Sequence, residues 1–259
     1  MLLALTGAGG AILAVPLLIF GLQLAVAEAA PIALLAVCLS ATMGATIALI
    51  QGKVRYRAAG FIAIIGVIAS PIGIWLAQKL PNAPLTLLFA AVLVYVAVDM
   101  FRDSVQGKKN VNAADTAPQP CLIETADGRL IWTWTCARAL ALSGSVAGFL
   151  SGLLGVGGGF VVVPALKKVT NLQMQTILAT SLAIIALISA MGVATAAYIG
   201  GMNWAIAIPF TAGALAGMLI GRFFASHLAG PKLQQAFAVV AICIAVGMVV
   251  KVIGVAGVF

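Results

Sequence analysis

Long apolar runs separated by short polar loops account for most of this chain. Six of the runs have the length of a membrane-spanning helix, about 20 residues, and they cover residues 29–50, 58–77, 85–101, 176–199, 204–225 and 233–253. The composition agrees with this pattern, because 63% of the residues are hydrophobic and only 8% are charged, whereas soluble domains carry roughly 25% charged residues. The pattern therefore predicts an all-α polytopic membrane protein.

A further apolar run, residues 137–166, is interrupted by glycines. They are Gly155, Gly157, Gly158 and Gly159. Each glycine costs a helix interior about 1 kcal/mol relative to alanine, so the cluster should break the helix. The arm that follows, residues 160–166, is too short to cross a bilayer, and the basic residues Arg138 and Lys167 at the two ends both favour the cytoplasmic side. We therefore expect a re-entrant helical hairpin with its glycine tip at membrane depth.

The two halves of the chain repeat each other at an offset of 148 residues. Gly9 aligns with Gly157 and Pro16 with Pro164 without a gap, so a second glycine-broken element lies at residues 6–16. Each half then contains one re-entrant hairpin and three transmembrane helices. Three crossings are an odd number, so the sequence predicts two inverted-topology repeats. In such proteins, paired helix breaks indicate a transporter's binding site.

The predicted repeats are residues 1–102 and 137–259, joined by a polar linker at residues 103–136. Basic residues in the short loops place the linker in the cytoplasm and the C-terminus outside, by the positive-inside rule. Within the linker, Asp127-Gly128 lies between two apolar stretches, which predicts a small β-hairpin. The basic residues of the short loops also account for the net charge of +8, so nucleic acid is not a predicted partner.

Residues that could carry catalysis or hold a metal are scarce. No carboxylate occurs between Gly128 and Phe259, the chain has one histidine, and its four cysteines form no CxxC pair. Metal cages and metal-assisted hydrolysis need ligands of these kinds. We therefore expect no metal, no cofactor and no enzymatic activity, and we interpret Cys38 and Cys243 as buried apolar thiols.

Two interpretations of the glycine clusters are open. In the first, the helix that begins at each break directs free N–H groups and the positive end of its dipole at an anion. The substrate-binding residues would then be Gly9, Gly10, Ala11 and Ile12 in the first half, and Gly157, Gly158, Gly159 and Phe160 in the second. In the second interpretation, glycine permits close helix packing, which better explains glycines spaced by four residues. These are Gly144, Gly148 and Gly152, and Gly213, Gly217 and Gly221.

Three polar residues near the ends of the predicted spans are further candidates. The hydroxyls of Thr180 and Ser181 could contact the substrate or bond to the helix backbone. Arg222 lies in the last turns of its span, where it is either a cation that reaches the membrane interface or a charge that steers anions inward.

The string GFLSGLLGVGGG from Gly148 to Gly159, followed by Val163-Pro164-Ala165-Leu166 and Ala179-Thr180-Ser181-Leu182, resembles the signature of the sulfite exporter TauE/SafE family. The GAGG…VP element, the repeat and the polar linker are similar to that family as well. The resemblance implies transport of a small sulfur-containing anion, such as sulfite, sulfoacetate or another organosulfonate, across the cytoplasmic (inner) membrane.

Two features depart from the family pattern. The first hairpin arm is nearly absent before Gly7, as if it were truncated or its start wrongly placed. The first half also has Ile32 and Ala33 where the second half has Thr180 and Ser181.

Together these observations predict a secondary transporter that binds a small sulfur-containing anion between two glycine tips. An anion channel is the alternative within transport, and a non-transport membrane scaffold or enzyme is the alternative outside it. The predicted partners are the anion and the lipid bilayer, and the sequence leaves a homo-oligomer open. It does not specify the substrate, the direction of transport or the coupling ion.

Overall fold

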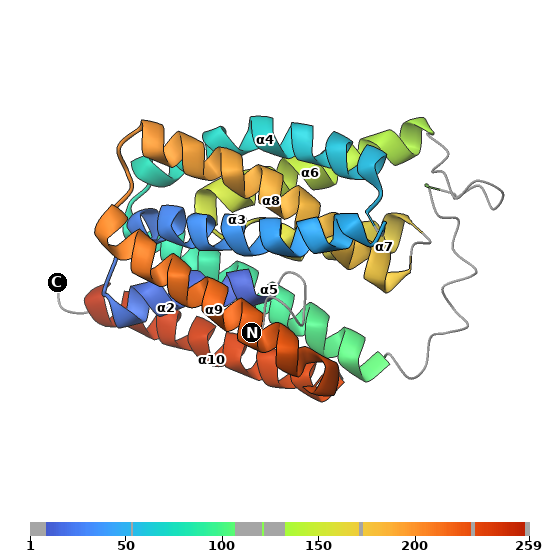
Figure 1. Ribbon diagram of the computed structural model, residues 1–259. Coiled ribbons are helices and arrows are strands. Elements are labelled where there is room, and N and C mark those ends of the chain that lie inside the picture. Colours follow the sequence, from blue (N-terminus) through green and yellow to red (C-terminus); the bar gives the residue numbers. More distant parts are fainter. Residues whose placement is uncertain are drawn as a thin grey trace.

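The computed structural model describes residues 9–52, 54–106, 121, 133–170, 173–228 and 231–256, and the side chains of residues 9–12, 100, 103–106, 221–237 and 252–256 are outside that description. All regular elements of the described residues are α-helices, apart from an isolated β-bridge between Cys121 and Thr170 (Figure 1). The helices are α2 (Gly9–Gly21), α3 (Val26–Ile50), α4 (Tyr56–Lys79), α5 (Asn82–Gln106), α6 (Trp134–Leu154), α7 (Gly159–Val169), α8 (Met174–Tyr198), α9 (Trp204–Leu228) and α10 (Pro231–Ala256).

The six spans predicted from hydropathy correspond to α3, α4, α5, α8, α9 and α10. Among the described residues, five helices are long and apolar enough to cross a bilayer, namely α3, α4, α5, α6 and α8. The stretches Trp204–Ile220 of α9 and Ala238–Lys251 of α10 are shorter but also apolar. The predicted all-helical, multi-pass membrane architecture is therefore confirmed.

Helices α6 and α7 form the two unequal arms of a hairpin. α6 has 21 residues, and α7 has only 11, which corresponds to a rise of about 16 Å, too little to cross a bilayer. A disulfide joins Cys121 to Cys136 in the first turn of α6, and the N–H of Cys121 donates to the carbonyl oxygen of Val169 at the end of α7. The base of the hairpin is thus tied across both arms. The β-hairpin predicted for the linker lies outside the described residues.

Helices α3 and α8 pack against each other at the centre of the molecule and run antiparallel (Figure 1). A Cβ on Gly44 of α3 would lie 3.1 Å from Leu182, and a Cβ on Gly192 of α8 would lie 3.0 Å from Leu34. Gly44 and Gly192 are 148 residues apart, and so are Leu34 and Leu182. The two contacts are therefore equivalent under the repeat. The packing between the halves is therefore reciprocal. Inverted topology in a bilayer stays a prediction.

Glycines bring α4 and α6 into direct backbone contact. A Cβ on Gly144 would lie 2.7 Å from the carbonyl oxygen of Ile62, and Cβ atoms on Gly148 and Gly152 would overlap carbonyl oxygens of α4. The packing interpretation of this glycine series is confirmed. It is wrong at Gly213 of α9, because nothing in the described structure lies within 4 Å of a Cβ built there.

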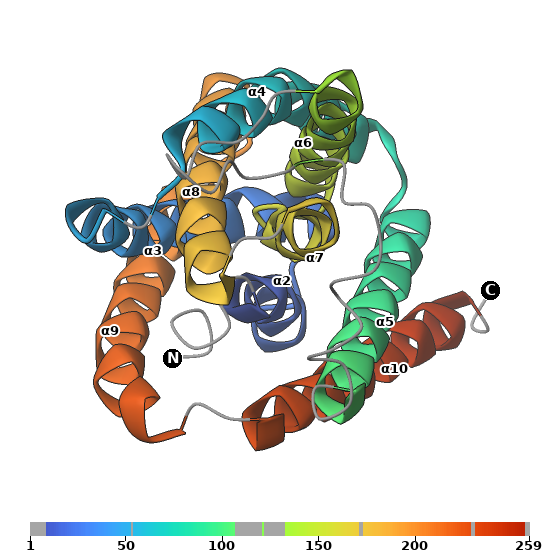
Figure 2. The same cartoon turned by 90° about the vertical axis from the view of Figure 1, so that its right-hand side faces the viewer.

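Helices α5 and α10 pair at the periphery, and α9 lies at the periphery as well, with α2 and α7 enclosed between them (Figure 2). α5 and α10 also carry large exposed apolar side chains such as Leu88 and Val240, as lipid-facing helices do. Cys243 of α10 is exposed and Cys38 of α3 is half-buried. The prediction of two buried thiols was therefore wrong for Cys243, because no described helix covers its side of α10.

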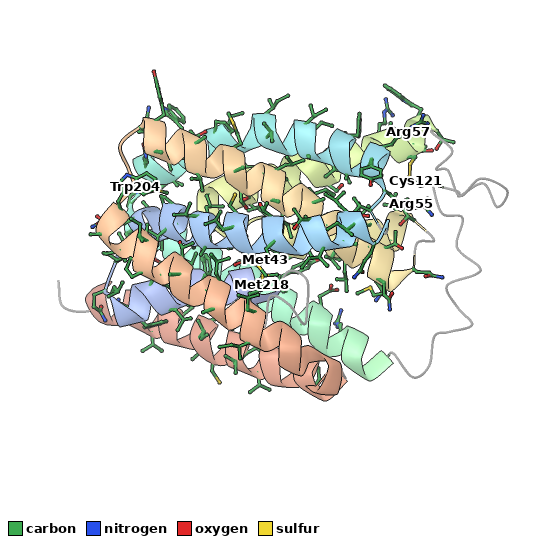
Figure 3. The ribbon with its side chains drawn as sticks, viewed as in Figure 1. Met43, Arg55, Arg57, Cys121, Trp204 and Met218 are labelled. Carbon is green, nitrogen blue, oxygen red and sulfur yellow. A yellow bond between two sulfur atoms is a disulfide. The ribbon has the colours of Figure 1, made fainter. Side chains whose placement is uncertain are left out.

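Charge is distributed unequally between the two ends of the bundle. The described cations at one end are Arg55, Arg57, Arg102, Arg138, Lys167 and Lys168, and those at the other end are Lys79 and Lys251. Figure 3 shows Arg55, Arg57 and Cys121 at the first end and Trp204 at the opposite end. Lys79 lies 3.9 Å from the centroid of the Trp75 ring. Tryptophans paired with cations are typical of residues that anchor helices at the membrane–water interface.

The contact between α4 and α6 predicts a large penalty for any side chain at Gly148. A valine there would force two backbones apart, and we expect Gly148→Val to lower the free energy of unfolding by about 3 kcal/mol. Gly213→Val is the matched control, with an expected cost below about 1 kcal/mol because its Cβ position is open. Thermal unfolding in detergent, followed by tryptophan fluorescence, measures both. Equal losses in the two variants would contradict the glycine-packed interface.

Candidate functional site

A turn built on three left-handed glycines joins α6 to α7. α6 ends at Leu154, and Gly155, Gly157 and Gly158 have φ values of 74°, 74° and 69°. Residues with a Cβ rarely adopt these angles, so the turn requires glycine. Gly158 is the N-cap of α7, and no side chain caps the helix there. The start of α7 therefore lacks the hydroxyl or carboxylate acceptor that usually satisfies a helix N-terminus.

The turn lies at half the height of the two central helices. A Cβ on Gly157 would lie 2.7 Å from Cγ1 of Val37 and 3.1 Å from Cγ2 of Ile185. Val37 is close to the middle of α3 and Ile185 is close to the middle of α8, and each helix has 25 residues. The two residues are repeat equivalents, 148 positions apart. The helix break is therefore inside the bundle, midway between its ends and beside the crossing of α3 with α8.

Amide N–H groups at the start of α7 have no partner in the described part of the chain. The N–H groups of Val161 and Val162 donate to the carbonyl oxygen of Gly158, at 3.1 and 3.2 Å. The N–H groups of residues 157–160 make no hydrogen bond within the described residues. All four residues are buried, and an unpaired buried amide is energetically costly. Free donors at the positive end of a helix dipole can bind an anion.

Buried serine hydroxyls lie around the same turn, and the sequence analysis missed them. Ser70 of α4, Ser151 of α6 and Ser189 of α8 each have an exposure of 0%. Among the described residues their hydroxyls lack a hydrogen-bond partner, as does that of Thr211 in α9. The Oγ of Ser189 lies 3.2 Å from the position of a Cβ on Gly157. Serine in the middle of an apolar run was the available signal, but only the folded structure shows that Ser189 lies beside the glycine turn.

The first half supplies a second helix that begins at a glycine pair. Gly9, Gly10, Ala11 and Ile12 form the first turn of α2, and their side chains lie outside the described residues. α2 and α7 contact each other, and Leu13 and Val15 of α2 share an apolar cluster with Phe160 of α7. The structure thus brings together the two helices whose N-termini were predicted to form the site.

Thr180 and Ser181 lie away from the glycine turn. The hydroxyl of Thr180 accepts a hydrogen bond from the N–H of Arg55 at 3.3 Å, and the hydroxyl of Ser181 donates to the carbonyl oxygen of Leu178 at 2.9 Å. Thr180 is nine residues before Ser189 in α8, about 13 Å along the helix axis. The structure does not bring this pair to the turn, and its contact with a substrate stays a prediction.

Arg222 belongs to the last part of α9, at the end of the bundle that carries most of the described cations. Its side chain lies outside the described residues. Its role in steering anions stays a prediction.

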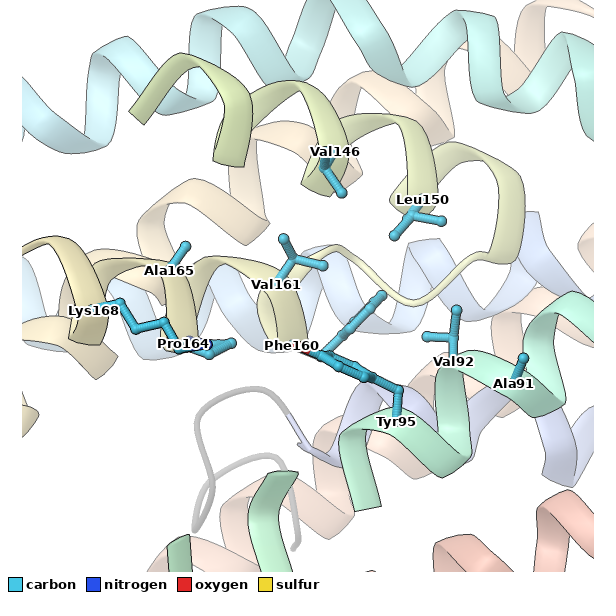
Figure 4. Close-up of a pocket in the computed structure, with 10 residues that line it drawn as sticks. All are labelled: Ala91, Val92, Tyr95, Val146, Leu150, Phe160, Val161, Pro164, Ala165 and Lys168. Atoms are coloured by element: carbon cyan, nitrogen blue, oxygen red, sulfur yellow. The ribbon is translucent and has the colours of Figure 1, made fainter. Parts of the chain in front are cut away.

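An apolar groove of about 520 Å³ follows α7 on the side that faces α5 (Figure 4). Its walls are Ala91, Val92 and Tyr95 of α5, Val146 and Leu150 of α6, and Phe160, Val161, Pro164, Ala165 and Lys168 of α7. Tyr95 and Lys168 are the polar side chains in this lining. A small inorganic anion would lose its hydration there and gain few donors. The glycine turn, rather than the groove, has the chemistry of an anion site.

Comparison with known proteins agrees with the membrane architecture. The family model described as sulfite exporter TauE/SafE matches residues 1–248. The chain belongs to the TauE/SafE family. A relative from Xylella fastidiosa (strain Temecula1), described as a probable membrane transporter protein, is 28% identical over 94% of this chain and 88% of its own length. The probable membrane transporter protein YunE of Bacillus subtilis (strain 168) is 26% identical over 84% of this chain and 81% of its own length. No solved structure matches the chain.

Membership of the TauE/SafE family indicates a membrane transporter rather than an enzyme, as do the names of the relatives. The protein is a multi-pass membrane protein, so its working environment is the lipid bilayer. In that environment water does not reach a buried helix break, and the break must be enclosed by protein or line a cavity.

Proposed function

We propose that this TauE/SafE protein is a secondary transporter that carries a small sulfur-containing anion, such as sulfite, sulfoacetate or another organosulfonate, across the cytoplasmic (inner) membrane. The observation that carries the proposal is the row of buried N–H groups from Gly157 to Phe160, which have no partner among the described residues. Sulfite and sulfonates present several acceptor oxygens around one charged centre. Amide donors at a helix N-terminus satisfy such oxygens without any cationic side chain.

The proposed route of transport passes between the two glycine tips. The start of α2, from Gly9 to Ile12, is the second group of donors, and the contact between helices α2 and α7 supports this route. Alternating access moves one hairpin-bearing unit against the other, so that the anion exchanges between the two sides. The end of the bundle that carries most of the described cations faces the cytoplasm, with the linker inside and the C-terminus outside.

Saturable transport is favoured over a channel by the packing at the turn. Val37 and Ile185 approach Gly157 so closely that a single Cβ would be in contact with both. A route through this point is closed until the hairpin or the central helices move. A protein that must move once for each substrate saturates, whereas an open pore does not.

Flux of radiolabelled sulfite into proteoliposomes tests the proposal. Wild-type protein should give saturable uptake above protein-free vesicles, and Gly158→Leu should reduce it by at least about tenfold. A side chain at residue 158 would press on the backbone of Ala147 and disturb the turn. Gly213→Leu is the control, because its Cβ position is open, and it should retain wild-type uptake.

Both variants must first be shown to fold, by size-exclusion chromatography and thermal unfolding. Normal sulfite flux in a folded Gly158→Leu protein would contradict the assignment of the site. Uptake that rises linearly with sulfite concentration would favour the channel.

Single-cysteine labelling tests the proposed orientation. Gln51 follows α3 and Gly201 precedes α9, both residues are exposed, and they lie at opposite ends of the bundle. In a background without the four native cysteines, Gly201→Cys should react with a membrane-impermeant maleimide added to intact cells. Gln51→Cys should react only after the membrane is permeabilised. Labelling of both positions from the same side would rule out the predicted topology.

A further inference from the structure

Ser189 is one of three buried serines, among the described residues, whose hydroxyl has no hydrogen-bond partner. The hydroxyl of Ser143 donates to the carbonyl oxygen of Leu140 at 2.8 Å, which is how serine in a transmembrane helix normally satisfies its hydroxyl. Ser189 makes no such bond in the described structure, although its exposure is 0%. Its Oγ instead faces the glycine turn, 3.2 Å from the Cβ position of Gly157. The hydroxyl of Ser189 does not bond to its own helix, so it is available to an acceptor at the glycine turn.

A second hydroxyl approaches the turn from α6. Ser151 lies one helical turn beyond Ala147 on the same side of α6, and a Cβ on Gly158 would lie 3.2 Å from the Cβ of Ala147. The carbonyl oxygen of Ser151 accepts the N–H of Gly155 at 2.9 Å, so Ser151 adjoins the start of the turn. Its hydroxyl also has an exposure of 0% and no partner among the described residues.

Ser70 places a third hydroxyl close by, from α4. Its Oγ lies 3.4 Å from the Cβ position of Gly192, which is three residues beyond Ser189 on α8. Ser70 is also fully buried and has no partner among the described residues. The unpartnered hydroxyls of Ser189 and Ser151 thus lie beside the glycine turn, and that of Ser70 lies about one helical turn farther along α8.

We propose that Ser189 is a substrate-binding, specificity-determining residue, and that it donates to an oxygen of the sulfur oxyanion that the amides of α7 do not reach. This inference rests on the proposed function. The free amides lie along the start of one helix and approach the anion from one direction. A pyramidal or tetrahedral oxyanion has further oxygens directed away from that helix. The hydroxyls of Ser189 and Ser151, on the neighbouring helices, are the donors placed for them.

The proposed site is asymmetric between the two halves of the chain. The repeat equivalent of Ser189 is Ala41, that of Ser151 is Leu3, and that of Ser70 is Met218. None of these three equivalent residues carries a hydroxyl, whereas Ser189 and Ser151 lie beside the turn that precedes α7. The substrate is held tightly at the tip of α7, and the tip of α2 contributes backbone donors alone.

Binding of the anion requires the turn to separate from the central helices. The close approach of Val37 and Ile185 to Gly157 leaves no room for a sulfite ion between them. Each unpartnered donor gains an acceptor when the anion enters, and these new hydrogen bonds offset the free energy of opening the turn.

The experiment measures thermal unfolding of the purified protein in detergent at increasing sulfite concentration, from which Kd follows. Ser189→Ala removes a hydroxyl that has no partner, so without sulfite its Tm should equal or exceed that of the wild type. Its Kd for sulfite should rise about 10- to 100-fold, as expected for loss of one hydrogen bond to a charged group. Ser143→Ala is the matched control, because its hydroxyl is bonded within α6, and its Kd should stay within about twofold of the wild type.

Three outcomes would overturn the inference. If Ser189→Ala binds sulfite as tightly as the wild type, Ser189 is not a ligand, and the proposed function stands. If Ser143→Ala loses as much affinity as Ser189→Ala, the effect is structural and not a contact with the anion. If the Tm of the wild type rises with neither sulfite nor sulfoacetate, the proposed function fails and this inference fails with it.

Discussion

A helix that begins inside an apolar bundle has backbone donors without partners, and this constraint underlies the structure of the present protein. The first four N–H groups of any helix lack an intrahelical acceptor. At the start of α7 they are also beyond the reach of water, at the mid-height of α3 and α8. Glycine at residues 155, 157 and 158 makes the required turn, and its lack of a side chain lets other helices approach closely. What remains is a compact set of donors in a region of low dielectric, where their interaction with an anion is strong.

The surrounding helices hold this turn in place. α6 is locked against α4 by a row of glycines, and α3 is packed against α8 by the reciprocal contacts of Gly44 and Gly192. The base of the hairpin is tied by Cys121, which links Cys136 to the end of α7. Such packing fixes the donors of the turn relative to one another, which favours specific binding once the turn has separated from the central helices. The same tight packing closes the site, so transport needs a concerted movement of helices.

The sequence predicted the elements well and their contacts less well. Six spans and a broken helix followed from the length of apolar runs and from a glycine cluster, because both depend on local properties of the chain. The contact of Ser189 with the glycine turn did not follow, since it depends on how α8 is rotated and where it crosses α3. Thr180 was a plausible ligand by sequence, yet its hydroxyl accepts the N–H of Arg55. Gly213 belongs to a glycine series like that of α6, but no helix packs against it in the described structure. The pairing of Cys121 with Cys136 crosses a polar segment without a periodic pattern, so spacing alone could not reveal it.

The central claim is that the amides at the start of α7 bind the sulfur oxyanion. Selenite has the shape and charge of sulfite, and selenium scatters X-rays anomalously, so a crystal structure with selenite locates the bound anion directly. The account predicts a selenium peak beside the glycine turn, with the oxygens of the ion within hydrogen-bond distance of the N–H groups of Gly158 and Gly159. A selenium peak beside Thr180, or in the groove between α5 and α7, with none at the turn would contradict it.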